Sequence, residues 1–208
     1  MTEREYGTIL VSVREHVLTI TLNNPARRNA IGPRMVNELL YAFADAFEAD
    51  EVNCIVLTGA GKAFCAGGDF SQMTGGADEA ELPPRGDYAD LLLLMVHAPK
   101  PIVARVNGHA MGGGLGLVAA THIAIGAHGS KLGTPEINVG LFPMMIMPLL
   151  SRLLPRRALT EMMLYGERVD AQRAAELGLL TRAVEPDLLD EAVAKACEKL
   201  SSKSPITM

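Results

Sequence analysis

Two glycine-rich segments contain residues well suited to hold a negatively charged oxygen. Residues 107–116 read NGHAMGGGLG, and three consecutive glycines there leave backbone N–H groups uncovered by side chains. At the start of a helix, such amides suit an oxyanion or a phosphate. Close packing of a strand against a helix also requires glycine, so this motif alone leaves both interpretations open.

A second loop of small residues, Ala66-Gly67-Gly68-Asp69, follows a predicted strand. Two loops of this kind can each direct one N–H group at the same oxygen atom, which is the arrangement that stabilises an anionic transition state. Known phosphate-binding motifs fit less well. No Gly-Lys-Ser/Thr follows the glycines, and the GxGxxG spacing of a dinucleotide fingerprint is absent.

Glu136 is the candidate general acid–base residue. It stands in Thr134-Pro135-Glu136. This tripeptide is also a good helix start, with a capping threonine, a proline in the first position and an acid favoured by the helix dipole. On local sequence alone the structural interpretation leads, and the combination of motifs described below reverses that order.

The remaining reactive side chains are predicted to be structural. The spacing of His109, His122 and His128 does not match a paired-histidine site, and no cysteine cluster joins them, so no metal is expected. For His109, next to the glycine run, packing is ranked ahead of catalysis. Cys65 lies on a predicted strand, where a small buried thiol is the commoner case.

The elements that must position these residues alternate between strands and helices. Short β-branched runs at 9–13 and 17–22 predict a hairpin, and apolar residues spaced by three and four after Pro33 predict a helix. Further strands are predicted at 54–57, 102–106, 122–125 and 180–184, a strand and loop at 63–70, and helices at 91–96, 112–120, 144–154, 157–164, 171–177 and 188–200. This pattern indicates an α/β fold with a C-terminal helical section.

Composition excludes several classes of protein. The chain has 208 residues, 49% of them hydrophobic, which is enough for one compact domain with a buried core. Its 19 basic and 24 acidic residues leave no wide basic face for nucleic acid. The apolar stretch 110–127 contains five glycines and is too short to span a membrane. Three cysteines and an N-terminus without an apolar signal stretch predict a cytoplasmic location.

Four motifs, in this order, resemble those of the crotonase, or enoyl-CoA hydratase/isomerase, superfamily. They are LNNPARRNAI at 22–31, KAFCAGGDF at 62–70, NGHAMGGGLGL at 107–117 and GTPEINVGLFP at 133–143. The resemblance implies a crotonase-like spiral of ββα units, followed by helices that trimerise. It divides the chain into a spiral core at 1–185 and the start of the C-terminal helical section at 186–208, short of the family's full length.

The resemblance also implies the site. An acyl-CoA thioester would place its carbonyl oxygen between the backbone N–H groups of Gly68 and Gly113, and Glu136 would transfer a proton. Arg27 and Arg28 would bring positive charge to the CoA phosphates. No cofactor is implied beyond the CoA of the substrate, and the expected assembly is a homotrimer or hexamer. Residues implied to line the CoA channel are Ala26, Arg28, Ala30, Ala66, Gly67, Asp69 and Phe70.

The chain departs from the family pattern at Gly116, where the resemblance implies a second glutamate in hydratases. Both glutamates of a hydratase position and deprotonate the water that adds to the double bond. A single carboxylate suits the movement of a proton between two carbons of the acyl chain, as in a Δ3,Δ2-enoyl-CoA isomerase. Three functions stay open: an isomerase, which the missing glutamate favours, a hydratase of fatty-acid or related acyl-CoA degradation, and a non-catalytic acyl-CoA-binding protein.

Overall fold

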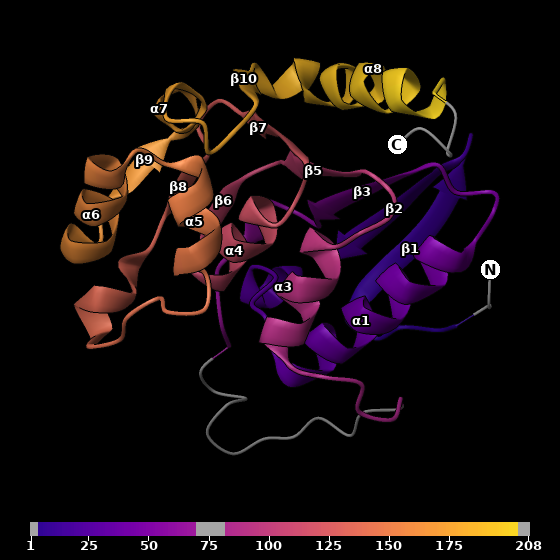
Figure 1. Ribbon diagram of the computed structural model, residues 1–208, viewed down its shortest axis with the longest axis horizontal. Coiled ribbons are helices and arrows are strands. Elements are labelled where there is room, and N and C mark those ends of the chain that lie inside the picture. Colours follow the sequence, from indigo (N-terminus) through magenta and orange to yellow (C-terminus); the bar gives the residue numbers. More distant parts are fainter. Residues whose placement is uncertain (1–3, 70–81, 204–208) are drawn as a thin grey trace.

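The computed structural model describes residues 4–69 and 82–203, which form two β-sheets flanked by helices (Figure 1). The larger sheet has the strand order β1 (Ile9–Arg14), β2 (Val17–Leu22), β3 (Cys54–Gly59), β5 (Ile102–Val106), β7 (Ile123–Ala127) and β10 (Arg182–Val184). β1 pairs with β2 in antiparallel fashion, and the other neighbours are parallel. The predicted hairpin is therefore confirmed, and β5 has its predicted bounds.

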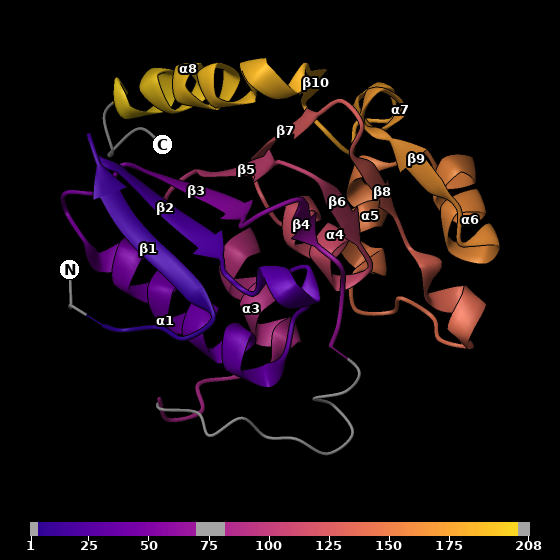
Figure 2. The same cartoon turned by 180° about the vertical axis from the view of Figure 1, so that it is seen from behind.

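The smaller sheet is seen best from behind (Figure 2). Its strands are β4 (Ala63–Cys65), β6 (His109–Met111), β8 (Lys131–Gly133) and β9 (Arg168–Asp170), in that order. The first three are parallel, and β9 is antiparallel to β8. β6, β8 and β9 were not predicted, because three residues are too few to show an alternating pattern.

The predicted α/β architecture is confirmed, with helices at every position where the sequence predicts one. The α-helices are α1 (Pro33–Glu48), α3 (Tyr88–Val96), α4 (Gly113–Ala119), α5 (Met147–Leu153), α6 (Arg156–Tyr165), α7 (Ala171–Glu176) and α8 (Leu189–Ser201), and the 3-10 helices are η1 (Pro25–Arg27), η2 (Pro135–Val139) and η3 (Pro186–Leu188). α3 begins three residues earlier than predicted, because Asp87 and Asp90 form a capping box at its start. Within the described ranges, no helix is long and apolar enough to cross a bilayer.

Helices cover both faces of the larger sheet because its strands alternate their side chains. Along β3, Ile55 and Leu57 belong to the core that includes α1 and α3, whereas Cys54 and Val56 pack with α8. All six residues of β3 are buried, as expected for a central parallel strand. Figure 1 shows α8 running along the opposite side of the sheet from α1.

The pairing of β4 with β6 positions two loops. Neighbouring parallel strands end at the same edge of a sheet, so the loop after β4 and the start of α4 after β6 must lie side by side. An ideal Cβ built on Gly67 would lie 3.1 Å from the Met111 carbonyl oxygen and 3.8 Å from the Gly113 nitrogen. The two glycine-rich segments singled out in the sequence are therefore in contact.

Candidate active site

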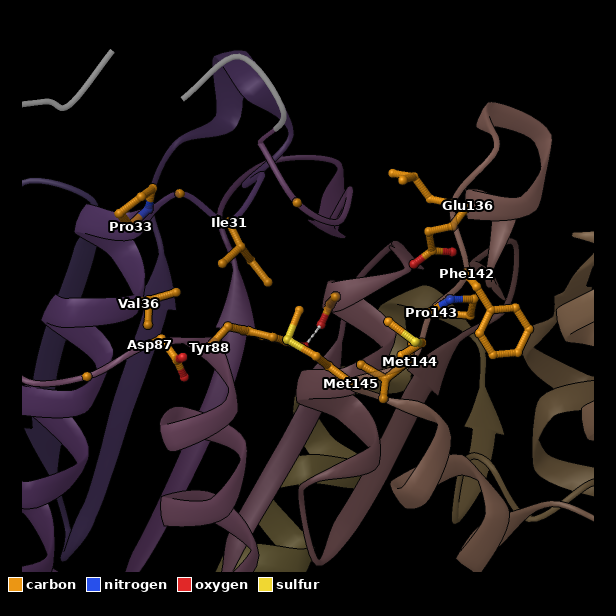
Figure 3. Close-up of a pocket in the computed structure, with 16 residues that line it drawn as sticks. Ile31, Pro33, Val36, Asp87, Tyr88, Glu136, Phe142, Pro143, Met144 and Met145 are labelled. Atoms are coloured by element: carbon orange, nitrogen blue, oxygen red, sulfur yellow. Dashed lines mark hydrogen bonds between the residues drawn. The ribbon is translucent and has the colours of Figure 1, made fainter. Parts of the chain in front are cut away.

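A cavity of about 540 Å³ lies between the N-termini of α1 and α3 on one side and the segment that follows η2 on the other (Figure 3). Gly68, Gly113 and Glu136 all line it. The three residues predicted to perform the chemistry are thus brought together in one cavity. Its walls are largely apolar and include Ile31, Pro33, Val36, Leu141, Phe142, Pro143, Met144, Met145 and Ile146.

The loop that carries Gly68 is fixed by hydrogen bonds on both sides of that residue. The Ile31 N–H donates to the Gly67 carbonyl at 2.7 Å, and the Asp69 N–H donates to the Ile31 carbonyl at 2.8 Å. These two hydrogen bonds form a parallel β-bridge between Ile31 and Gly68, and the N–H group of Gly68 itself takes no part in it. It has no acceptor in the part of the chain that the structure describes. Gly68 therefore offers a positioned but unused donor.

The amide of Gly113 is unused for a different reason. Gly113 is the first residue of α4, and the first N–H groups of a helix have no intrahelical acceptor. The preceding Gly112 N–H donates to the Gly133 carbonyl at 2.9 Å, whereas Gly113 has no acceptor among residues 4–69 and 82–203. Two unused amides from adjacent loops thus line one cavity, as an oxyanion hole requires.

Glu136 lies in η2 with its carboxyl group directed into the cavity (Figure 3). The Oε2 atom is buried and has no hydrogen-bond partner among the described residues. The other oxygen, Oε1, would be only 2.4 Å from a Cβ on Gly112, so the carboxyl group lies against the backbone that leads into Gly113. Burial raises the pKa of Glu136 above that of an ordinary glutamate. A carboxyl group with one buried oxygen, unpaired among the described residues, thus lies next to the segment that carries Gly113.

The alternative interpretation, in which Thr134-Pro135-Glu136 is only the capped start of a helix, is supported in part. Thr134 does not cap η2, because its hydroxyl donates instead to the Met162 carbonyl at 2.9 Å. Pro135 and Glu136 do open a helix, but it is a 3-10 helix of five residues.

The raised pKa of Glu136 leads to a testable pH dependence. A general base works only when ionised, so activity should increase as pH rises through the pKa of this carboxyl group. Because burial raises that pKa, the acidic limb of the kcat/KM profile should lie above the pKa of an ordinary glutamate. The measurement is the pH dependence of kcat/KM with a 3-enoyl-CoA. A limb at or below the ordinary glutamate value would contradict this assignment.

None of the described residues predicted to line the CoA channel belongs to the wall of this cavity. The Ala66 N–H donates to the Arg28 carbonyl at 3.0 Å, which joins the segment of Ala26, Arg28 and Ala30 to the loop that carries Gly67. Ala26 and Arg28 are exposed, and the Arg28 guanidinium makes no ion pair with another described residue. Phe70 lies outside the described residues.

The prediction that Arg27 offers its charge to the CoA phosphates stays a prediction, and the structure adds an ion pair to it. Its guanidinium donates to the carboxylate of Asp69, whose side chain is only 8% exposed. The side chain of Asp69 is accordingly a buried partner of Arg27, and its place in the CoA channel stays a prediction. Both arginines are exposed, and Arg28 is the one of the two without an ion pair to another described residue.

Asn29 holds the arginine segment in place and was not singled out in the sequence. Its side chain is fully buried, its amide donates to the carbonyls of Ala60 and Ala63 at 2.9 Å, and its oxygen accepts from the Asn24 N–H at 3.0 Å. Its backbone is left-handed, with φ of 57°, a conformation that asparagine tolerates. No local pattern marks it, because its contacts with Ala60 and Ala63 are tertiary.

Replacement of Asn29 by alanine should therefore destabilise the protein. Asn29→Ala leaves buried backbone groups unpaired, and we expect the free energy of unfolding to fall by about 3 kcal/mol. Denaturant titration followed by circular dichroism measures this change. The matched control is Asn53→Ala, because the Asn53 side chain has no hydrogen bond within the described ranges. Equal losses in the two variants would refute the assigned role.

Tyr88, which no motif of the sequence marks, reaches the site from α3. Its hydroxyl donates to the Gly113 carbonyl, drawn as the dashed line in Figure 3. It also occupies the space beside Gly116, the position of the missing second glutamate. Tyr88 is 25 residues from Gly113 in the chain, and no local signal connects them.

The other reactive side chains are structural, as predicted. Cys65 is fully buried, and burial raises the pKa of its thiol to about 12. His109 accepts from the Lys131 N–H at 3.0 Å, and His122 accepts from the Ile102 N–H at 3.1 Å. Among the described residues, no group of three or more potential metal ligands is found.

Comparison with known proteins identifies relatives along almost the whole chain. The family model of enoyl-CoA hydratase/isomerase matches residues 12–208. The rat mitochondrial enoyl-CoA hydratase domain-containing protein 3 is 32% identical over 205 residues, which cover 94% of this chain and 66% of the rat protein. A putative enoyl-CoA hydratase of Thermus thermophilus is 37% identical over 201 residues, which cover 93% of this chain and 78% of that protein.

Solved structures agree with these relatives. An enoyl-CoA hydratase of Mycobacterium smegmatis superposes with a TM-score of 0.88 at 34% identity, over 96% of this chain and 78% of that one. Human enoyl-CoA hydratase domain-containing protein 3 gives a TM-score of 0.87 at 27% identity, over 96% of this chain and 79% of that one. The crotonase-like fold predicted from four motifs is confirmed, and the chain belongs to the enoyl-CoA hydratase/isomerase family of the crotonase superfamily.

Proposed function

We propose that the protein is an enoyl-CoA isomerase that stabilises a thioester enolate and transfers a proton with one glutamate. The observation that carries this proposal is the buried, unpartnered Oε2 of Glu136 in the same cavity as the unused amides of Gly68 and Gly113. Among the described lining residues the only other acid is Asp87. Its carboxylate accepts from the Ala89 and Asp90 amides as the cap of α3, so it is already engaged.

The proposed reaction begins with a 3-enoyl thioester whose carbonyl oxygen accepts hydrogen bonds from Gly68 and Gly113. Glu136 removes a proton from the α-carbon, and the electron pair delocalises onto the carbonyl oxygen as a dienolate. The same carboxylic acid returns the proton to the γ-carbon, which moves the double bond into conjugation with the thioester. Each amide lowers the barrier by about 3 kcal/mol, because its N–H dipole is already oriented toward the oxygen before the reaction.

The apolar walls support proton transfer over hydration. Hydration needs a water molecule held beside the double bond by a second acid, and the wall around Gly116 instead presents Cγ2 of Ile146 and the Tyr88 hydroxyl, whose proton is donated to the Gly113 carbonyl. The acyl chain fits such a surface, since apolar groups leave water when they bind there.

Incubation with two substrates tests the proposal. With a 3-enoyl-CoA, we expect conversion to the conjugated 2-enoyl-CoA, detected by the gain of absorbance and by unchanged mass. With a 2-enoyl-CoA, we expect slow or no increase in mass by one water. Rapid hydration without isomerisation would establish the hydratase instead, and binding without either reaction would establish a non-catalytic acyl-CoA-binding protein.

A homotrimer or hexamer is part of the same proposal. The family likeness supports it, and so do large apolar side chains left in solvent on η2, on α6 and between them, notably Val139, Met144 and Tyr165, which are 68%, 70% and 64% exposed. Exposed apolar surface of this extent commonly marks an interface. Light scattering of the pure protein gives the number of subunits, and a monomer at micromolar concentration would overturn this part.

A further inference from the structure

Tyr88 contacts both Gly113, the proposed oxyanion donor, and the space beside Gly116. It is the first residue of α3, and the capping box of Asp87 and Asp90 fixes the backbone from which it projects. Its hydroxyl donates to the Gly113 carbonyl. It also lies 3.5 Å from an ideal Cβ on Gly113, in contact with the residue whose amide is the proposed oxyanion donor.

The position of Tyr88 explains why residue 116 is glycine. A Cβ at Gly116 would lie 2.3 Å from the Tyr88 hydroxyl and 2.3 Å from Cγ2 of Ile146. Real Cβ atoms do not approach other atoms so closely, and both obstacles are held in the core, so any side chain at 116 requires them to move. The tyrosine and the isoleucine together fill the volume that a glutamate at 116 would need.

We propose that Tyr88 is the specificity-determining residue of this pocket: with Ile146 it occupies the place of a second acid, and through Gly113 it positions the oxyanion hole for single-glutamate chemistry. This inference rests on the proposed enolate function, since it concerns which reaction the enolate undergoes. It identifies a residue outside the four family-like motifs as the group that separates proton transfer from hydration.

The chemistry of a phenol suits this role. Burial, with the nearby Cys65 and Glu136, raises the pKa of Tyr88 well above the ordinary tyrosine value, so the hydroxyl stays neutral. Its single proton is committed to the Gly113 carbonyl, which leaves only lone pairs for any other contact. A neutral phenol in this state cannot remove a proton from water, whereas the carboxylate of a glutamate at position 116 could.

The hydrogen bond to Gly113 adds a positioning effect. The Gly113 carbonyl belongs to the first turn of α4, and glycine restrains its own backbone poorly. By holding the Gly113 carbonyl, the Tyr88 hydroxyl therefore limits rotation of the backbone about Gly113, whose N–H is the proposed donor. A displaced donor stabilises an oxyanion less, because its strength depends on distance and angle.

The first experiment uses Tyr88→Phe, which keeps the ring and removes the hydroxyl. The pure variant is saturated with cinnamoyl-CoA, whose absorbance shifts to longer wavelength when its carbonyl is polarised by hydrogen bonds. We expect a smaller shift than in the unmodified protein, with kcat for isomerisation about tenfold lower and KM nearly unchanged. Tyr41→Phe is the matched control, because the Tyr41 hydroxyl also donates to a backbone carbonyl, that of Pro83, and Tyr41 lies outside the cavity lining. An unchanged shift and unchanged kcat in Tyr88→Phe would overturn the positioning role.

The second experiment tests the exclusion of an acid. Gly116→Glu is introduced alone and into Tyr88→Phe/Ile146→Ala, the background in which both close contacts are removed. Hydration of a 2-enoyl-CoA should rise at least about tenfold in the triple variant over its own background, and should not rise in Gly116→Glu alone. Equal gains in the two settings, or a folded triple variant without any gain, would overturn the exclusion. If the triple variant does not fold, the Tyr88→Phe measurement alone decides whether Tyr88 is retained as the specificity-determining residue.

Failure of this inference is distinguishable from failure of the proposed function. If the unmodified protein neither shifts the cinnamoyl-CoA spectrum nor isomerises a 3-enoyl-CoA, the enolate function is wrong and Tyr88 has no reaction to select. If the unmodified protein does both and Tyr88→Phe is indistinguishable from it, the function stands and the role of Tyr88 is wrong.

Discussion

Replacement of Glu136 by glutamine is expected to lower kcat for isomerisation by about 10²–10⁴-fold, the contribution of a positioned general acid–base group. The amide of glutamine has nearly the same shape as the carboxyl group but cannot accept the α-proton. Acyl-CoA affinity should change little, because Glu136 approaches the reacting carbons rather than the CoA segment. Steady-state kinetics with a 3-enoyl-CoA and calorimetric titration with a saturated acyl-CoA measure the two quantities separately.

The control for this variant is Glu161→Gln, an exposed glutamate of α6 that does not line the cavity. Its kcat should equal that of the unmodified protein. If Glu136→Gln binds acyl-CoA and leaves every reaction unchanged, Glu136 is not the proton-transfer group, and a non-catalytic acyl-CoA-binding function becomes the better interpretation.

Gly112→Ala should have the second largest effect, although Gly112 touches no reacting atom. Its φ is +48°, which penalises a side chain, and the added Cβ would lie 2.4 Å from Oε1 of Glu136. The carboxyl group must move away from Gly113 to make room. We expect kcat/KM to fall about 10²-fold from this displacement, and the free energy of unfolding to fall by about 1–3 kcal/mol from the backbone conformation.

Gly129→Ala separates these two effects. Gly129 also has a positive φ, of +84°, but nothing lies within 4 Å of the position of its Cβ. This variant should lose stability to a similar degree and keep its activity. A Gly112→Ala protein that is destabilised but fully active would show that the position of the Glu136 carboxyl group is not critical.

Long elements could be predicted from the sequence, and the second sheet could not. The helix at Pro33–Glu48 and the strand at Ile102–Val106 carry patterns long enough to recognise, and both were found. β6, β8 and β9 have three residues each, and their stability comes from neighbours rather than from their own sequence. The smaller sheet therefore becomes visible only in three dimensions.

The same division holds for the candidate site. Gly68, Gly113 and Glu136 were predicted because short motifs around them resemble a known family, and the structure brings them to one cavity. The partner of Arg27 was not predicted, because the ion pair with Asp69 joins residues 42 positions apart. Tyr88 was missed for the same reason, since its role depends on helix packing and not on its neighbours in the chain.

The pairing of β4 with β6 has a consequence for how the protein reaches its working state. Each strand contributes three residues, and Cys65 must find Ala110 across 45 positions of chain before the two donor amides can converge. Contacts between distant segments form slowly, because closure of the intervening loop costs entropy first. A refolding intermediate with α1 and the first hairpin but without this pair would show part of the native ellipticity and would lack the cavity between the two loops. Recovery of turnover during refolding should thus report this long-range pairing and not the formation of the first helices.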